Sequence, residues 1–191
     1  MTEQMTLAAE PRTVGVKRGG AKTVRAGLIP GVVYGSAVEP FAISIEPKDL
    51  DAVMATEFGA NKVFDLAVGD KRHLCMVKDT QFDVVRRHLT HVDLYVVDPE
   101  QSIVLDVPVR PEGKSAGERL GGLLQVVSRT VRVRCKVKDI PPVVLHDVTE
   151  VGLGDQVSID QMTAPAQTEF VFKHRFPVIR VAARRGGKKG K

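Results

Sequence analysis

The sequence predicts a mainly β protein with a few short helices, divided into two domains. Valine is abundant, tryptophan is absent and aromatic residues make up 5% of the 191 residues, a composition that favours strands over long helices. Short apolar segments bounded by glycine, proline and aspartate recur along the chain. The turn-forming segment Val97-Asp98-Pro99-Glu100 interrupts them near the middle. We therefore expect one domain over residues 1–97, a second over residues 98–182, and a tail over residues 183–191.

The first half predicts a small, strongly curved sheet or barrel. Residues Pro47–Met54 are expected to form a helix, because proline suits the first position and the apolar residues that follow share one face. Many short strands with one or two helices in fewer than about 100 residues are typical of such a barrel. The predicted strands are Val32–Tyr34, Phe41–Ile45, Val63–Val68, His73–Lys78 and His91–Val97.

The second half predicts a separate β domain. Residues Gly113–Gly122 are rich in glycine and polar side chains, so we expect a loop there. The last residues have no apolar side chain to pack and are expected to be disordered. The predicted strands are Ile103–Val109, Val131–Val137, Val143–His146, Gln156–Ile159 and Phe170–Phe172.

The net charge of +5 and the pI near 9.3 are weak indicators of function. Residues 173–191 contain eight cations and no carboxylate, so the excess lies in the C-terminal segment. Cys75 and Cys135 are distant in sequence and lack metal-ligand spacing, which predicts two reduced core thiols. No signal peptide or membrane span is evident. We expect a cytoplasmic protein with no metal, cofactor, small-molecule substrate or membrane partner.

The segment from Arg12 to Gly35 is basic and contains no carboxylate. Its glycines allow close approach of the backbone to a partner, and no acidic group cancels the positive field. Such a segment can lie along RNA phosphates, although most charge runs are simply solvated surface loops. Its cations are Arg12, Lys17, Arg18, Lys22 and Arg25.

The tripeptide His91-Val92-Asp93 lies on a predicted strand, where residues two apart point to the same face. Three interpretations are open. The carboxylate can simply hold the imidazole, the pair can belong to a metal or general-base site with His88, or it can contact RNA. In the third case the carboxylate must meet donors such as a 2′-hydroxyl or a guanine amine. Tyr34, at the end of a predicted strand, also suits a ribose or base contact.

Two motifs suggest phosphate binding only superficially. Gly113-Lys114-Ser115 ends like a nucleotide-binding loop, but Pro108 stands where the first glycine is required. The pair Gly121-Gly122 is better explained as a turn. Since no catalytic motif is present, we expect no enzymatic activity.

Several segments together resemble the bacterial large-subunit ribosomal protein twenty-five family, in its longer two-domain form known as CTC or general stress protein. Residues 25–35 (RAGLIPGVVYG), and Gln81 followed by residues 91–94 (HVDL), resemble the family's N-terminal motifs. In the second half, residues 107–109 (VPV), 121–122 (GG), 139–141 (DIP) and 152–155 (GLGD) do the same. The similarity covers roughly residues 7 to 180.

The resemblance implies a barrel-like N-terminal domain that binds 5S ribosomal RNA, followed by a separate β domain. It also implies a role as a structural constituent of the large ribosomal subunit, with neighbouring ribosomal proteins as further partners. The family's RNA contacts correspond here to Arg12, Arg25, Tyr34, His91 and Asp93, with Lys17, Lys22 and Gln81 as auxiliaries.

Three positions depart from the family pattern. Thr23-Val24 stand where further arginines are usual, which removes phosphate contacts. Leu94 replaces a phenylalanine, a change in packing. The C-terminal segment is basic where the family is often acidic, which would add nonspecific RNA contacts.

Overall fold

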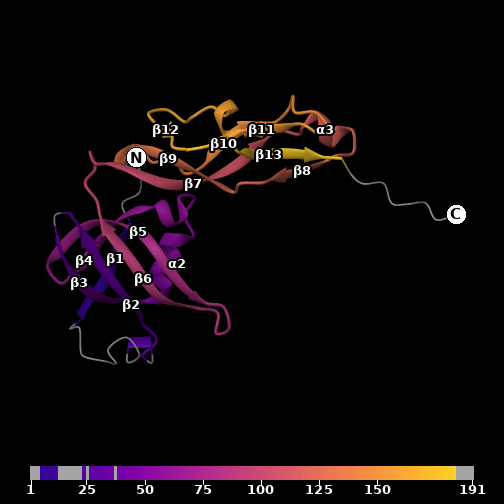
Figure 1. Cartoon of the computed structure of the whole chain (residues 1–191). Helices are drawn as coiled ribbons and strands as arrows, with labels where there is room; N and C mark the ends of the chain where they lie inside the picture. Colours follow the sequence, from indigo (N-terminus) through magenta and orange to yellow (C-terminus); the bar gives the residue numbers. More distant parts are fainter. Residues whose placement is uncertain (1–4, 13–22, 25, 37, 184–191) are drawn as a thin grey trace. The chain divides into compact units, whose positions relative to one another are not determined.

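The computed structural model describes residues 5–12, 23, 24, 26–36 and 38–183, which form two compact units, Met1–Gln101 and Ser102–Lys191 (Figure 1). Both units consist mainly of strands joined by short helical segments, which confirms the predicted fold class. The sequence predicts a domain boundary between residues 97 and 98, and in the structure the boundary between the two units lies four residues later, between residues 101 and 102. Of the predicted basic tail, residues 184–191 lie outside the described residues.

The first unit is a closed barrel with the strand order β1-β3-β2-β6-β5-β4. Neighbouring strands are antiparallel except for the pairs β2–β6 and β1–β4, which are parallel. Its strands are β1 (Thr6–Arg12), β2 (Ile29–Gly35), β3 (Val38–Ile45), β4 (Val63–Val68), β5 (Lys71–Asp83) and β6 (His88–Val96), with helix α2 (Pro47–Met54) and a 3-10 turn (Gly59–Asn61) between β3 and β4.

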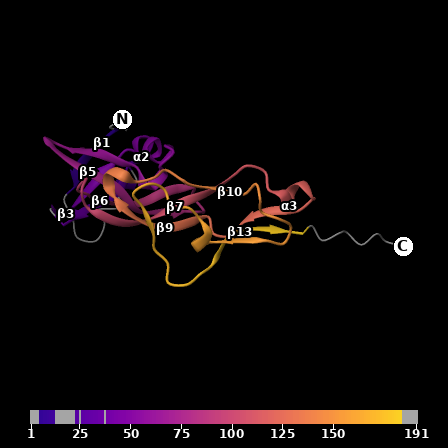
Figure 2. The same cartoon turned by 90° about the horizontal axis from the view of Figure 1, so that it is seen from above.

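Side chains that point inward at alternate positions along each strand fill the interior of the barrel. Along β6, Val92 and Leu94 are fully buried in the core, while Asp93 between them points outward and stays partly exposed. Helix α2 adds Leu50 and Val53 to the same core and lies against the barrel wall in Figures 1 and 2. Its bounds are those predicted from the sequence. The core therefore fixes which side chains of each strand face outward.

Strand β2 approaches β6 so closely at Gly31 that no larger residue fits. A Cβ atom there would lie 2.9 Å from both Cγ1 and the carbonyl oxygen of Val92. The Ile29-Pro30-Gly31 segment thus supplies the small residue that the parallel pairing of β2 with β6 requires.

The second unit contains two sheets, with strand orders β10-β7-β9-β12 and β11-β13-β8. In β9, valines and a cysteine point into the core and alternate with exposed threonine and basic residues. The elements are β7 (Ser102–Glu112), α3 (Ala116–Arg119), β8 (Leu123–Val126), β9 (Thr130–Lys136), a 3-10 turn (Val137–Asp139), β10 (Val144–Asp147), β11 (Gln156–Ser158), a 3-10 turn (Ile159–Gln161), β12 (Glu169–Phe170) and β13 (Pro177–Ala182).

Four elements differ from the sequence prediction. Arg12 ends strand β1 and does not begin a loop, because Thr6–Arg12 pairs with both β3 and β4. The predicted loop over residues 113–122 contains helix α3, which a reciprocal capping box between Ser115 and Glu118 starts. Strands β8 and β13 were not predicted, and they are held by pairing with each other.

Cys75 and Cys135 are free and buried, as predicted. Burial raises the pKa of the Cys75 thiol to about 12, with a further contribution from the Asp65 carboxylate. Across the described part of the chain, none of the helices has the length and apolar character needed to cross a bilayer.

Candidate nucleic-acid interface

Strand β6 carries a histidine–aspartate pair on the outer face of the barrel. Nδ1 of His91 lies 2.8 Å from Oδ1 of Asp93, and both side chains are about one-third exposed. The strand holds them together because Val92 between them points into the core. This geometry confirms the juxtaposition predicted from the spacing. When Nδ1 donates its proton to Asp93, Nε2 of a neutral imidazole is left as an acceptor.

Strand β5 places a second polar pair beside the first. In the antiparallel register Gln81 lies opposite His91, and Asp79 lies opposite Asp93. The register of β5 against β6 shifts between Val77 and Asp79. The residues just before this shift are buried, whereas Asp79 and Gln81 after it are exposed. Gln81, far from His91 in the chain, is therefore its direct neighbour in space.

Strand β2 borders the pair on the other side. Tyr34 lies opposite Tyr95 in the parallel register, and the two ring centroids are 5.7 Å apart in an edge-to-face arrangement. Burial raises the pKa of Tyr34 above its usual value, and the nearby carboxylates of Asp93 and Asp79 raise it further. The phenol is therefore protonated at neutral pH and can donate a hydrogen bond.

These side chains form one surface, which we call the polar strip. It crosses three adjacent strands, β2, β6 and β5. Its four predicted members come from three strands, and sequence reasoning missed two others, Tyr95 and Asp79. Tyr95 follows Asp93 by two residues on the same strand, so the alternation would have found it. The strip consists of Tyr34, Asp79, Gln81, His91, Asp93 and Tyr95.

Arg12 lies on β1, on the side of the closed barrel opposite β6 and Asp93. It pairs with Ala42 of β3, which pairs with Val32 of β2, which in turn pairs with Asp93. Three strand spacings of about 4.8 Å separate β1 from β6 along this row. The Nε atom of Arg12 is buried and has no hydrogen-bond partner among the described residues. The remaining predicted cations, Lys17, Lys22 and Arg25, lie outside the described residues.

The metal or general-base interpretation of His91 and Asp93 requires a third ligand. The described residues contain no group of three or more histidine, cysteine, aspartate or glutamate side chains that could hold a metal ion. A closed barrel that presents polar and aromatic side chains on its outer strands is an arrangement typical of binding modules for nucleic acids.

Comparison with known proteins assigns both halves of the chain. Residues 7–94 match the Ribosomal L25p family, and residues 102–185 match the C-terminal domain of ribosomal protein TL5. The chain is 34% identical over 185 residues to a protein of Halothermothrix orenii named large ribosomal subunit protein bL25, covering 95% of this chain and 83% of the relative. Proteins of the same name from Desulfatibacillum aliphaticivorans and Geobacter sulfurreducens are 35% and 30% identical over 93% and 94% of this chain, and 82% and 93% of their own lengths.

The chain therefore belongs to the Ribosomal L25p family and carries the C-terminal domain found in TL5. This confirms the resemblance drawn from the motifs in both halves, and a protein of this family is a structural protein and not an enzyme.

Proposed function

We propose that this protein binds 5S ribosomal RNA through the outer face of its N-terminal barrel, with the polar strip as the surface that reads the RNA. Membership of the Ribosomal L25p family makes it a structural constituent of the large ribosomal subunit, at work on the cytoplasmic ribosome. The observation that carries the RNA assignment is the pair of His91 and Asp93, held 2.8 Å apart on the outer face between Gln81 and Tyr34.

The chemistry of the polar strip suits an RNA minor groove better than a phosphate backbone. Carboxylates repel phosphates, so Asp79 and Asp93 favour hydrogen-bond donors. The wide, shallow minor groove of RNA offers 2′-hydroxyls and guanine amines, both of which donate to a carboxylate. Nε2 of His91 and the neutral phenol of Tyr34 add an acceptor and a donor for ribose hydroxyls.

Phosphate contacts fall to the cations of the basic segment. Arg12, on β1, lies three strands from Asp93 in either direction around the closed barrel, so its side chain faces a different side of the barrel from the polar strip. Lys17, Lys22 and Arg25 belong to the same basic segment of the sequence and are proposed to act with Arg12. In this division the cations orient the protein on the RNA, and the strip distinguishes one RNA from another.

The full-length protein should discriminate among RNAs. We expect it to bind 5S ribosomal RNA at least tenfold more tightly than transfer RNA or an unrelated RNA of equal length, in gel shifts at two salt concentrations. Asp93→Asn should remove most of this preference, whereas Asp70→Asn, in the exposed turn between β4 and β5, should leave it intact. Equal affinity of the wild-type protein for the three RNAs would overturn the proposal.

A further inference from the structure

The β5–β6 hairpin extends beyond its neighbouring strands. Strand β2 pairs with β6 only from Val92 onward, and β4 pairs with β5 only up to Met76. Among the described residues, the part of the hairpin around residues 80–91 therefore pairs only with itself, and Figure 1 shows it reaching past the rest of the barrel. Its exposed residues include Phe82, which is 55% exposed, and Val85, which is 92% exposed.

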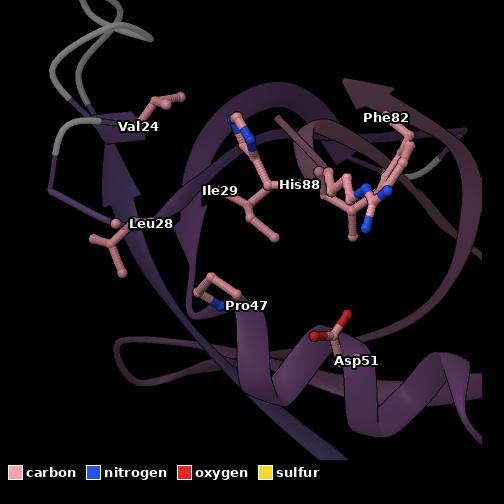
Figure 3. A pocket seen from close by; sticks show the side chains of 10 residues that line it. Val24, Leu28, Ile29, Pro47, Asp51, Phe82 and His88 are labelled. Atoms are coloured by element: carbon pink, nitrogen blue, oxygen red, sulfur yellow. The ribbon is translucent and has the colours of Figure 1, made fainter. Parts of the chain in front are cut away.

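A groove lies between this hairpin, the turn that precedes β2 and the start of α2. It has a volume of about 460 Å³. The apolar side chains of Leu28, Pro47 and Phe82 line it, together with the polar groups of Asp51, Arg87 and His88. Figure 3 shows Asp51 rising from α2 on one side of the hollow and Phe82 on the hairpin across from it. We call it the hairpin groove.

The hairpin groove adjoins the polar strip. Gln81 of the strip and Phe82 of the groove are consecutive residues, and the register of β5 against β6 shifts between them. A partner that contacts Gln81 and His91 on the outer face therefore lies next to Phe82, the following residue, which lines the groove.

The charges of the hairpin favour a polyanion. Arg86 and Arg87 lie at its tip, and the carboxylate nearest to them, Asp83, accepts hydrogen bonds from the backbone amides of Val85 and Arg86 at 2.9 and 3.0 Å. Those bonds lower the pKa of Asp83 and hold its charge within the turn.

We propose that the hairpin groove receives one unstacked base of the bound RNA. This rests on the proposed function and adds a second contact to it. The ring of Phe82 supplies a stacking surface, and single-stranded or looped RNA offers bases that can leave the helical stack. The guanidinium of Arg87 neutralises the phosphate of the same nucleotide. The Asp51 carboxylate accepts a hydrogen bond from an exocyclic amine, which selects adenine, guanine or cytosine over uracil.

The test uses the full-length protein and 5S ribosomal RNA. Since stacking of one base contributes about 1–3 kcal/mol, Phe82→Ala should weaken binding by roughly 5- to 100-fold. Phe82→Tyr, which keeps the ring, should bind within about twofold of the wild type. Val85→Ala is a matched control on the same hairpin, because Val85 is exposed and does not line the groove.

Two further variants test the polar side of the groove. Arg87 has a positive φ of 53°, a conformation that asparagine tolerates, so Arg87→Asn removes the charge without straining the turn. It should weaken binding and flatten the salt dependence. Asp51→Asn should reduce the preference for an amine-bearing base at the one RNA position that enters the groove.

Chemical probing of the RNA locates the base. One nucleotide should be protected by the wild-type protein and reactive in the Phe82→Ala complex, while the rest of the footprint stays unchanged. Unchanged affinity and footprint in Phe82→Ala would overturn the groove assignment and leave the polar strip standing. If Phe82→Ala binds RNA normally but is incorporated poorly into ribosomal subunits, the groove binds a protein, and the proposal of a bound base is overturned as well. If the wild-type protein does not prefer 5S ribosomal RNA over the other RNAs, the proposed function itself is refuted, whatever the groove binds.

Discussion

Nδ1 of His91 lies 2.8 Å from Oδ1 of Asp93, and this contact ties the imidazole to a carboxylate that has no lysine or arginine of the described residues within ion-pair distance. Such a carboxylate is unfavourable near phosphates and favourable near hydroxyl and amine donors. In the proposed complex the pair therefore specifies the kind of RNA surface more closely than any cation of the protein does.

Replacing Asp93 tests this directly. Asp93→Ala should weaken binding to 5S ribosomal RNA by about 1–3 kcal/mol, roughly 5- to 150-fold, because donors in the RNA lose their acceptor. The slope of log K against log salt concentration should not change, since no phosphate contact is lost. Fluorescence anisotropy at several salt concentrations measures both quantities, with Asp70→Ala as the control. Tighter binding of the variant would show that Asp93 meets phosphate and would refute its assigned role.

The cations should have the opposite signature. Four or five phosphate contacts predict a slope of about −3 to −4, and Arg25→Ala should flatten it by nearly one unit. Arg12→Gln should act similarly, because Arg12 is the first cation of the same basic segment of the sequence. Arg72→Ala, exposed at the start of β5, serves as the control for loss of a positive charge. A slope that stays unchanged in Arg12→Gln would exclude Arg12 from the phosphate contacts.

The ionisation of Tyr34 should report on the polar strip in the free protein. The chain contains two tyrosines, so the difference between the ultraviolet titrations of the wild type and Tyr34→Phe isolates this phenol. Its pKa should lie above 10, and Asp93→Asn should bring it down, because burial and then the Asp93 carboxylate raise it.

The sign of this shift sets a pH window. A pKa raised on folding stabilises the protein below pH 10, and that contribution is lost as the pH rises through the folded value. A wild-type midpoint at or below 10 would mean that Tyr34 does not lie beside these carboxylates.

Gly31→Ala should destabilise the barrel. The added Cβ would lie 2.9 Å from the carbonyl oxygen of Val92, which the paired backbone cannot easily move. We expect a loss of about 1–3 kcal/mol in the free energy of unfolding. Tyrosine fluorescence during urea unfolding measures it, because both tyrosines lie in the first unit and the chain has no tryptophan. Ser36→Ala, exposed just after β2, should be neutral, and an equally stable Gly31→Ala would contradict the close approach.

Local patterns predicted the elements whose structure is decided locally. Helix α2 was predicted with its observed bounds, because proline and an apolar face act within eight residues. Strand β1 was missed, because Thr6–Arg12 has few β-branched residues and owes its conformation to pairing with β3 and β4. Helix α3 was missed because it is a single turn that depends on its cap.

The same distinction applies to the candidate site. The proximity of His91 and Asp93 follows from their spacing on one strand. The placement of Gln81 and Tyr34 beside them depends on a bulged register and a parallel pairing, which no local pattern encodes. The hairpin groove was not predicted at all, because three segments distant in sequence form it.

Strand β1 is the seam of the barrel, since it joins β3 on one side and β4 on the other. Loss of the first twelve residues would leave two strands with bare backbone amides and carbonyls where the wall was continuous. Unpaired strand edges of this kind favour strand exchange between copies of the protein. Proteolytic removal of β1 would therefore turn a closed barrel into a protein prone to polymerise.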